Sequence, residues 1–167
     1  SGAYAQLLQR QMVTLGSGDR SISIGRESLA AGADSIASGT GAYAAKANAI
    51  AVGTASQALG VGSIAIGRNA IATGSVALGD AAQAGNGGTA IGDGAVGTYM
   101  SGATTAGTVA GTALGKNAQA DVSGATALGT GAQATAANSV ALGSSSVASG
   151  STLTQAAYVP GGATVAG

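Results

Sequence analysis

The sequence lacks most of the residues on which enzymes depend. Its 167 residues contain no cysteine, histidine, tryptophan or phenylalanine, and only one proline. Without cysteine and histidine, the common ligands of zinc, haem and iron–sulfur clusters are missing, as are thiol catalysis and every catalytic arrangement built on an imidazole. The sequence therefore predicts a protein that is not an enzyme, with no metal site and no cofactor.

Charge and long apolar runs are also scarce. Lys and Arg together number six, Asp and Glu together number six, and the formal net charge is zero. With no basic cluster, the chain is not expected to bind nucleic acid. No apolar run approaches the ~18–20 residues of a membrane span, so this fragment is not expected to insert into a membrane.

The sequence does contain a short string of residues that is repeated along the chain and ends in glycine. Typical copies are SIAIG (Ser63–Gly67) and SVALG (Ser75–Gly79 and Ser139–Gly143). The closing glycines are Gly25, Gly39, Gly53, Gly67, Gly79, Gly92, Gly115, Gly129 and Gly143. Five of the eight steps between them are 14 residues, which indicates an internal structural repeat.

Each repeat has the pattern of two short strands. The residue three before the closing glycine is nearly always Ile, Val or Thr, the residue one before is usually aliphatic, and the residue between them is almost always Ala. This alternation on β-branched residues predicts a strand. Small residues three and five after the glycine predict a second strand, and Gly or Asn two after it fits a left-handed turn. The pattern predicts an all-β solenoid of ~14-residue coils over residues 20–150.

The same columns suggest which side chains face inward. We expect the large residues of the first strand to meet the small residues of the second across a thin interior, and the alanines of the first strand to face outward. Because such a thin coil buries little apolar surface, these alanines are expected to line an interface between copies of the chain with closed rotational symmetry. They are Ala37, Ala51, Ala65, Ala77, Ala90, Ala113, Ala127 and Ala141. The residues four after each glycine, Tyr43 and Gln119 among them, are expected on the outer wall.

The repeat resembles the YadA-like head of trimeric autotransporter adhesins, whose motif is often written Asn-Ser-Val-Ala-Ile-Gly-x-x-Ser. The nearest copy here runs from Asn138 to Gly143, with Ser146 at the last position, and Asn48–Gly53 with Ser56 is a second. The resemblance implies a left-handed parallel β-roll assembled as a homotrimer. It also implies a virulence-associated adhesin displayed at the outer membrane of a Gram-negative bacterium and binding collagen-like matrix proteins or host receptors, with neck, stalk and anchor outside this fragment.

Several residues are candidates for ligand contact. Asn138, Ser139 and Ser146 carry the motif of the resemblance, and Tyr43 belongs to the expected outer row. The step from Gly92 to Gly115 contains nine extra residues, so residues near 93–111 form either a degenerate coil with a surface loop or a projecting contact site. In the second case Tyr99 and Met100 would contact the ligand.

The two ends depart from the repeat. Residues 1–19 are expected to form a lead-in and cap segment, with helix-like spacing in residues 3–15 that favours a short helical cap or irregular coil about as much as a strand. Residues 151–167 are expected to lead out of the solenoid.

Two other functions use similar compositions. An ice-binding β-solenoid would need a flat array of threonines, whereas Thr89, Thr112 and Thr126 occupy only three positions of a column expected inside. A purely structural spacer of a surface fibre is the other alternative. A β-helix enzyme acting on polysaccharides would need acidic clusters and longer coils, which this chain lacks.

Overall fold

The computed structural model describes residues 13–85, 87–97, 110–150, 157–158 and 164–165. These residues form strands and turns without a helix, as two long sheets and one short one. In spatial order, sheet A contains β1 (Val13–Leu15), β2 (Ile22–Ile24), β4 (Ile36–Ser38), β6 (Ile50–Val52), β8 (Ile64–Ile66), β10 (Val76–Leu78), β12 (Thr89–Ile91), β14 (Thr112–Leu114), β16 (Thr126–Leu128) and β18 (Val140–Leu142).

Sheet B is built from the second strand of each repeat. Its strands are β3 (Leu29–Ala30), β5 (Tyr43–Ala44), β7 (Gln57–Ala58), β9 (Ile71–Ala72), β11 (Gln83–Ala84), β13 (Val96–Gly97), β15 (Gln119–Ala120), β17 (Gln133–Ala134) and β19 (Val147–Ala148). A separate antiparallel pair, β20 (Ala157–Tyr158) and β21 (Thr164–Val165), follows near the C-terminus.

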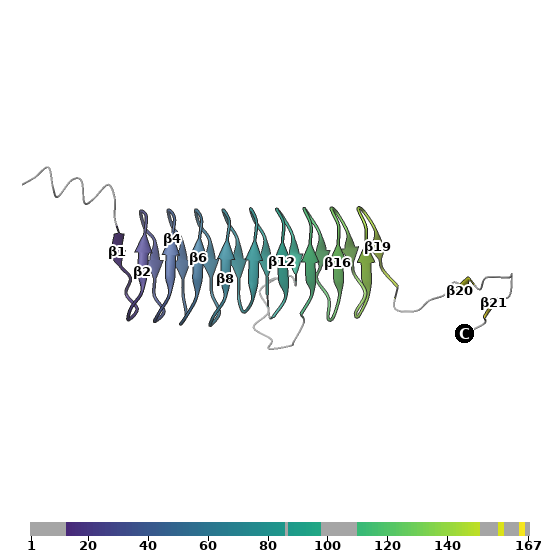
Figure 1. The fold of residues 1–167 in the computed structure, drawn as a ribbon, viewed down its shortest axis with the longest axis horizontal. Helices are drawn as coiled ribbons and strands as arrows, with labels where there is room; N and C mark the ends of the chain where they lie inside the picture. Colours follow the sequence, from purple (N-terminus) through teal and green to yellow (C-terminus); the bar gives the residue numbers. More distant parts are fainter. Residues whose placement is uncertain (1–12, 86, 98–109, 151–156, 159–163, 166–167) are drawn as a thin grey trace, which may run out of the picture.

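The repeats stack as coils in chain order, with β2 near one end and β19 at the other (Figure 1). From β2 onward, successive strands of sheet A pair in parallel with like residues in register, for example Ala65 with Ala77, and sheet B does the same. The predicted all-β parallel solenoid is therefore confirmed. The pattern also continues through Val96 and resumes by Thr112, so the extra residues fall within 98–111.

The first strand reverses direction and covers the N-terminal edge of sheet A. β1 pairs antiparallel with β2, with Val13 opposite Ile24 and Leu15 opposite Ile22. Beside it, the Gly18 amide donates to the carbonyl of Ala30 in the first strand of sheet B (3.1 Å). Residues 13–15 are thus a strand, and the helical alternative is wrong there; residues 1–12 lie outside the described part. This antiparallel cap protects strand edges that would otherwise invite association.

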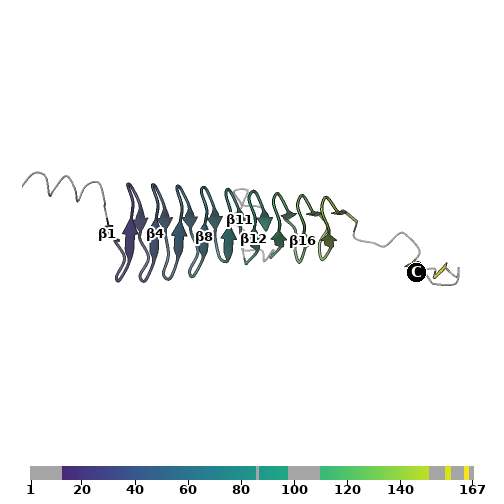
Figure 2. The same cartoon turned by 45° about the horizontal axis from the view of Figure 1, so that its top comes forward.

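Two rows of turns join the sheets, one along each edge of the stack (Figures 1 and 2). The turn that follows each strand of sheet A opens with the closing glycine, as at Gly53, where φ is +126°. A Cβ on Gly53 would lie 2.6 Å from the carbonyl oxygen of Gly67 in the next coil, so only glycine fits. Two residues later the backbone is left-handed, as predicted, for example at Asn69 (φ +57°) and Asn117 (φ +55°).

The interior of the solenoid is filled by alanine and serine. The alanines of sheet A that were expected to face outward are fully or almost fully buried within the single chain. They are Ala37, Ala51, Ala65, Ala77, Ala90, Ala113, Ala127 and Ala141. The small residues of sheet B, such as Ala44 and Ala58, face them from the other side. The predicted orientation of sheet A is therefore wrong: the small faces of both strands meet, because the coil is too thin for larger side chains.

The large residues of sheet A point outward instead. Ile24, Ile66, Leu78 and Leu114 are 37–43% exposed in the single chain. Thr89, Thr112 and Thr126, expected inside, lie in register on this outer side as well. The outward position of the row four after each glycine in sheet B is confirmed by its alternation with buried alanines.

Candidate interaction surfaces

The outer side of sheet A is a broad uncharged surface, here called the aliphatic face. It consists of the two rows that flank the buried alanines. One row contains Ile22, Ile36, Ile50, Ile64, Val76, Thr89, Thr112, Thr126 and Val140; the other contains Ile24, Ser38, Val52, Ile66, Leu78, Ile91, Leu114, Leu128 and Leu142. Their regular parallel register makes the face continuous from the first coil to the last. Continuous exposed apolar surfaces of this kind mark contact sites.

The outer side of sheet B is narrower and more polar, and we call it the amide face. It presents one side chain per coil: Leu29, Tyr43, Gln57, Ile71, Gln83, Val96, Gln119, Gln133 and Val147. Four of these nine are glutamine and none is charged. Gln119 and Gln133 are neighbours in register, so their backbones lie about 4.8 Å apart along the stack. Such a row can make the same contact repeatedly along an extended partner.

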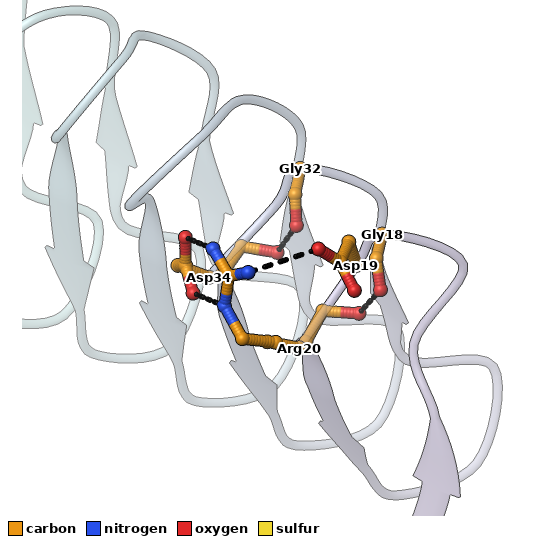
Figure 3. A network of polar contacts seen from close by, with 7 residues as sticks. Gly18, Asp19, Arg20, Gly32 and Asp34 are labelled. Atoms are coloured by element: carbon orange, nitrogen blue, oxygen red, sulfur yellow. Dashed lines mark hydrogen bonds and ion pairs between the residues drawn. The ribbon is translucent and has the colours of Figure 1, made fainter.

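Charged residues of the described segments lie in turns or directly after a strand, never on either outer face. At the N-terminal end, Arg20 donates two hydrogen bonds of 2.6 Å to the carboxylate of Asp34 in the next coil and one of 3.0 Å to Asp19 (Figure 3). The bidentate bond from Arg20 lowers the pKa of the Asp34 carboxyl below its usual value. Because this cluster is exposed, it links two coils without contributing much stability.

Buried serines close the turns. Figure 3 also shows serine hydroxyls bonded to the carbonyls of Gly18 and Gly32; these belong to Ser21 and Ser35, with bonds of 2.6 Å. Ser63 makes the same bond to Gly60 (2.8 Å). Each of these hydroxyls bonds the carbonyl three residues earlier, so it closes a turn while its own hydrogen-bonding need is met.

The predicted ligand-contact residues do not form one cluster. Asn138 has left-handed backbone (φ +57°) in a turn of the last coil. The hydroxyls of Ser139 and Ser146 donate to the carbonyls of Ala136 (2.6 Å) and Gly143 (2.9 Å), so both serve turns at opposite edges of that coil. Tyr43 lies on the amide face near the other end of the stack, 36% exposed. Tyr99 and Met100 fall outside the described residues.

The aliphatic face is the feature that sequence reasoning misplaced. The signal was available, because both strands of each repeat carry small residues on one side. Two short strands joined by tight turns bring these small sides together, and the large residues are then left outside. Alanines with no exposed surface in a single chain cannot contact a second copy, so any interface on this side belongs to the flanking aliphatic rows.

Neither a metal-binding cluster nor a membrane-spanning helix is found in the part of the chain that the structure describes. Its residues contain no group of three or more His, Cys, Asp or Glu side chains that could hold a metal ion. Within the same ranges, there is no helix of the length and apolarity needed to cross a bilayer.

Fold and surfaces together define a repetitive β-solenoid that presents long, uncharged outer faces along its described residues. The YadA head domain repeat matches residues 17–42, 44–70, 109–132, 123–146 and 134–151, which is more than half of the chain. The chain therefore belongs to the YadA head family, a family of trimeric autotransporter adhesin-like domains and not of enzymes. A comparison with curated protein sequences gives no significant match.

Proposed function

We propose that this chain is the head of a bacterial surface adhesin, that three copies assemble through their aliphatic faces, and that the assembled head binds host extracellular matrix or host cell-surface components. The observation that carries this proposal is the aliphatic face itself. It is continuous along nine stacked coils, and it is 37–45% exposed at many of its large side chains in a single chain.

The thin interior makes assembly advantageous. A buried methyl group contributes about 0.8 kcal/mol, and the core of each coil consists of little more than such groups. The larger Ile, Leu and Val side chains are only partly buried by the chain itself. Covering them with copies of the same face recovers the apolar burial that the interior cannot supply. A closed symmetric assembly does this for every copy equally.

The family generally implies trimers displayed at the cell surface, which favours three copies here. With the aliphatic faces turned toward a common axis, the amide faces of all copies remain outward and accessible. Their regular spacing suits a long partner that makes many weak contacts, such as a collagen-like matrix fibre. Tyr43 is the one aromatic side chain of this row, and Asn138, Ser139 and Ser146 remain candidate contacts at the other end.

Two measurements test the proposal. Light scattering of the purified chain should give the mass of three copies, and binding to immobilised matrix proteins or host cells should be saturable. A folded single-chain species would overturn the assembly. A trimer that binds nothing across a broad panel of matrix proteins and cells would overturn adhesion and leave a structural spacer. Thermal hysteresis above that of buffer would favour the ice-binding alternative.

A further inference from the structure

The two edges of the solenoid differ in a systematic way. The turns from sheet A to sheet B always contain four residues, for example 53–56 and 67–70, and we call this row the constant edge. The turns from sheet B to sheet A usually contain five residues, for example 45–49 and 59–63, but three of them depart from this length. Only three residues (73–75) precede β10, four (85–88) precede β12, and fourteen (98–111) precede β14. This second row is called the variable edge.

We infer that, in the assembled head, the constant edge of one copy packs against the variable edge of the next, with Arg68, Asp80 and Asp93 of one copy set against Val61 and the shortened turns of its neighbour. This inference rests on the proposed assembly. If the aliphatic faces surround an axis parallel to the stack, rotation brings unlike edges of adjacent copies together. It also keeps the same coil of every copy at the same height.

Carboxylates of the constant edge occur at the two heights where the variable edge is shortest. The residue after the closing glycine is a small hydroxyl residue in four coils, namely Thr40, Thr54, Thr130 and Ser144, and a charged residue in the other five, namely Arg26, Arg68, Asp80, Asp93 and Lys116. In the coils of β10 and β12, whose preceding turns are short, the equivalent residues are Asp80 and Asp93. Short turns on one copy therefore leave space where its neighbour presents charged side chains.

The charged side chains of the constant edge are already joined into a row. Arg68 pairs with Asp80, and the Asp80 amide donates to the carboxylate of Asp93 (2.9 Å), although these residues lie in three successive coils. Arg68 is 65% exposed and Asp80 is 40% exposed. The row is thus held in place in the single chain and available to a neighbour.

An exposed apolar side chain lies on the variable edge, at the other side of the solenoid from this charged row. Val61, in the turn that precedes β8, is 70% exposed at the variable edge. At the same height, the constant edge carries Arg68, which follows β8. The hydrocarbon stem of an arginine can cover an apolar side chain while its guanidinium stays solvated. Packing of Arg68 from the next copy over Val61 would remove this exposed surface.

Disulfide cross-linking tests the contact, since the chain has no native cysteine. The variant carries Gly74→Cys at the variable edge and Asp80→Cys at the constant edge of the same coil. A Cβ at Gly74 would meet nothing closer than the Gly87 amide nitrogen at 3.7 Å, so the first change is sterically tolerated. Within one chain, the strand β10 alone separates the two positions by about 10 Å, which exceeds the reach of a disulfide.

Mild oxidation should convert this variant into covalent trimers on non-reducing gels, whereas each single variant should remain uncross-linked. The matched control pairs Gly74→Cys with Ser144→Cys, which lies four coils further along, about 19 Å at ~4.8 Å per coil, and should not cross-link. A second double variant, Val61→Cys with Arg68→Cys, tests the same contact one coil away. It keeps the inference testable if the variant with Gly74→Cys and Asp80→Cys does not fold.

The outcomes separate this inference from the proposed function. A trimer by light scattering in which neither same-height pair cross-links overturns the contact between edges and leaves the assembled head intact. Cross-linking of the control as efficiently as of the same-height pairs also overturns it, because the contact would then lack the inferred register. A single-chain mass overturns the assembly and the contact together.

Discussion

Ala65 and Ile66 are adjacent in β8, yet they occupy opposite environments. Ala65 has no exposed surface, whereas Ile66 is 37% exposed on the outer side of the same strand. The same contrast recurs along sheet A, where alanine points into the coil and a larger aliphatic residue points out. In an ordinary domain the larger apolar residue would be the buried one.

This reversal follows from the width of the coil. With strands of only two or three residues and turns of a few more, the two sheets lie too close for branched side chains between them. The core is therefore made of methyl and hydroxymethyl groups, while ladder hydrogen bonds hold each coil to the next. The large side chains are left for contacts outside the coil. In this fold, small residues therefore build the core, and large aliphatic residues build the surface available for association.

The strongest way to break this contrast is a charge on the inner side. Ala65→Glu should unfold several coils, because it places a carboxylate in a fully enclosed site with no partner and no space. We expect a loss of more than about 4 kcal/mol in the free energy of unfolding. Thermal unfolding followed by circular dichroism measures it. Gln119→Glu, on the exposed amide face, is the control and should unfold like the unchanged chain.

The same substitution one residue later should have a different effect. Ile66→Glu places its carboxylate on the aliphatic face, where a single chain leaves it in water. The strand signal should persist, while the mass measured by light scattering should fall from that of a trimer to that of one chain, because the charge would be buried between copies. A trimer that tolerates Ile66→Glu would show that the interface lies elsewhere.

The repeat made much of this architecture predictable. The strands, their parallel register and the left-handed turns follow from periodic side-chain types, and all were found where the columns placed them. The inward-facing side of sheet A was predicted wrongly, because alternation identifies two sides of a strand without showing which one is buried. Size decides that question only when the width of the coil is known, and the width depends on how sharply both turns fold.

The interaction surfaces were harder to predict for the same reason. Gln119 and its row were correctly placed outside because their partners on the inner side are alanines. For the alanines of sheet A, a uniformly small row predicts contact with a second copy, which the structure does not bear out. The structure gives the simpler cause, contact with the opposite strand of the same coil.

A smaller effect on the free energy of unfolding is expected from serines in the turns that lead into sheet A, and it depends on the length of the turn. Ser35 is fully buried and donates to the Gly32 carbonyl (2.6 Å), so Ser35→Ala should cost about 1 kcal/mol. Ser75 occupies the equivalent position before β10, but its turn is two residues shorter, and its buried hydroxyl has no partner in the described residues. Ser75→Ala should therefore leave the free energy of unfolding unchanged or raise it. Equal losses in the two variants, measured by chemical denaturation, would contradict the role given to turn length.

The smallest expected effect concerns the outermost charges. Hydrogen bonds from Arg20 lower the pKa of Asp34 in the folded chain. A carboxyl with a depressed folded pKa adds stability above its unfolded pKa of about 3.9, and that contribution is lost as the pH falls through the folded value. Asp34→Asn should thus lower the melting temperature slightly at neutral pH, with the difference from the unchanged chain disappearing in acid. Because the pair is exposed, high salt should also reduce the difference. A difference that grows on acidification would contradict this assignment.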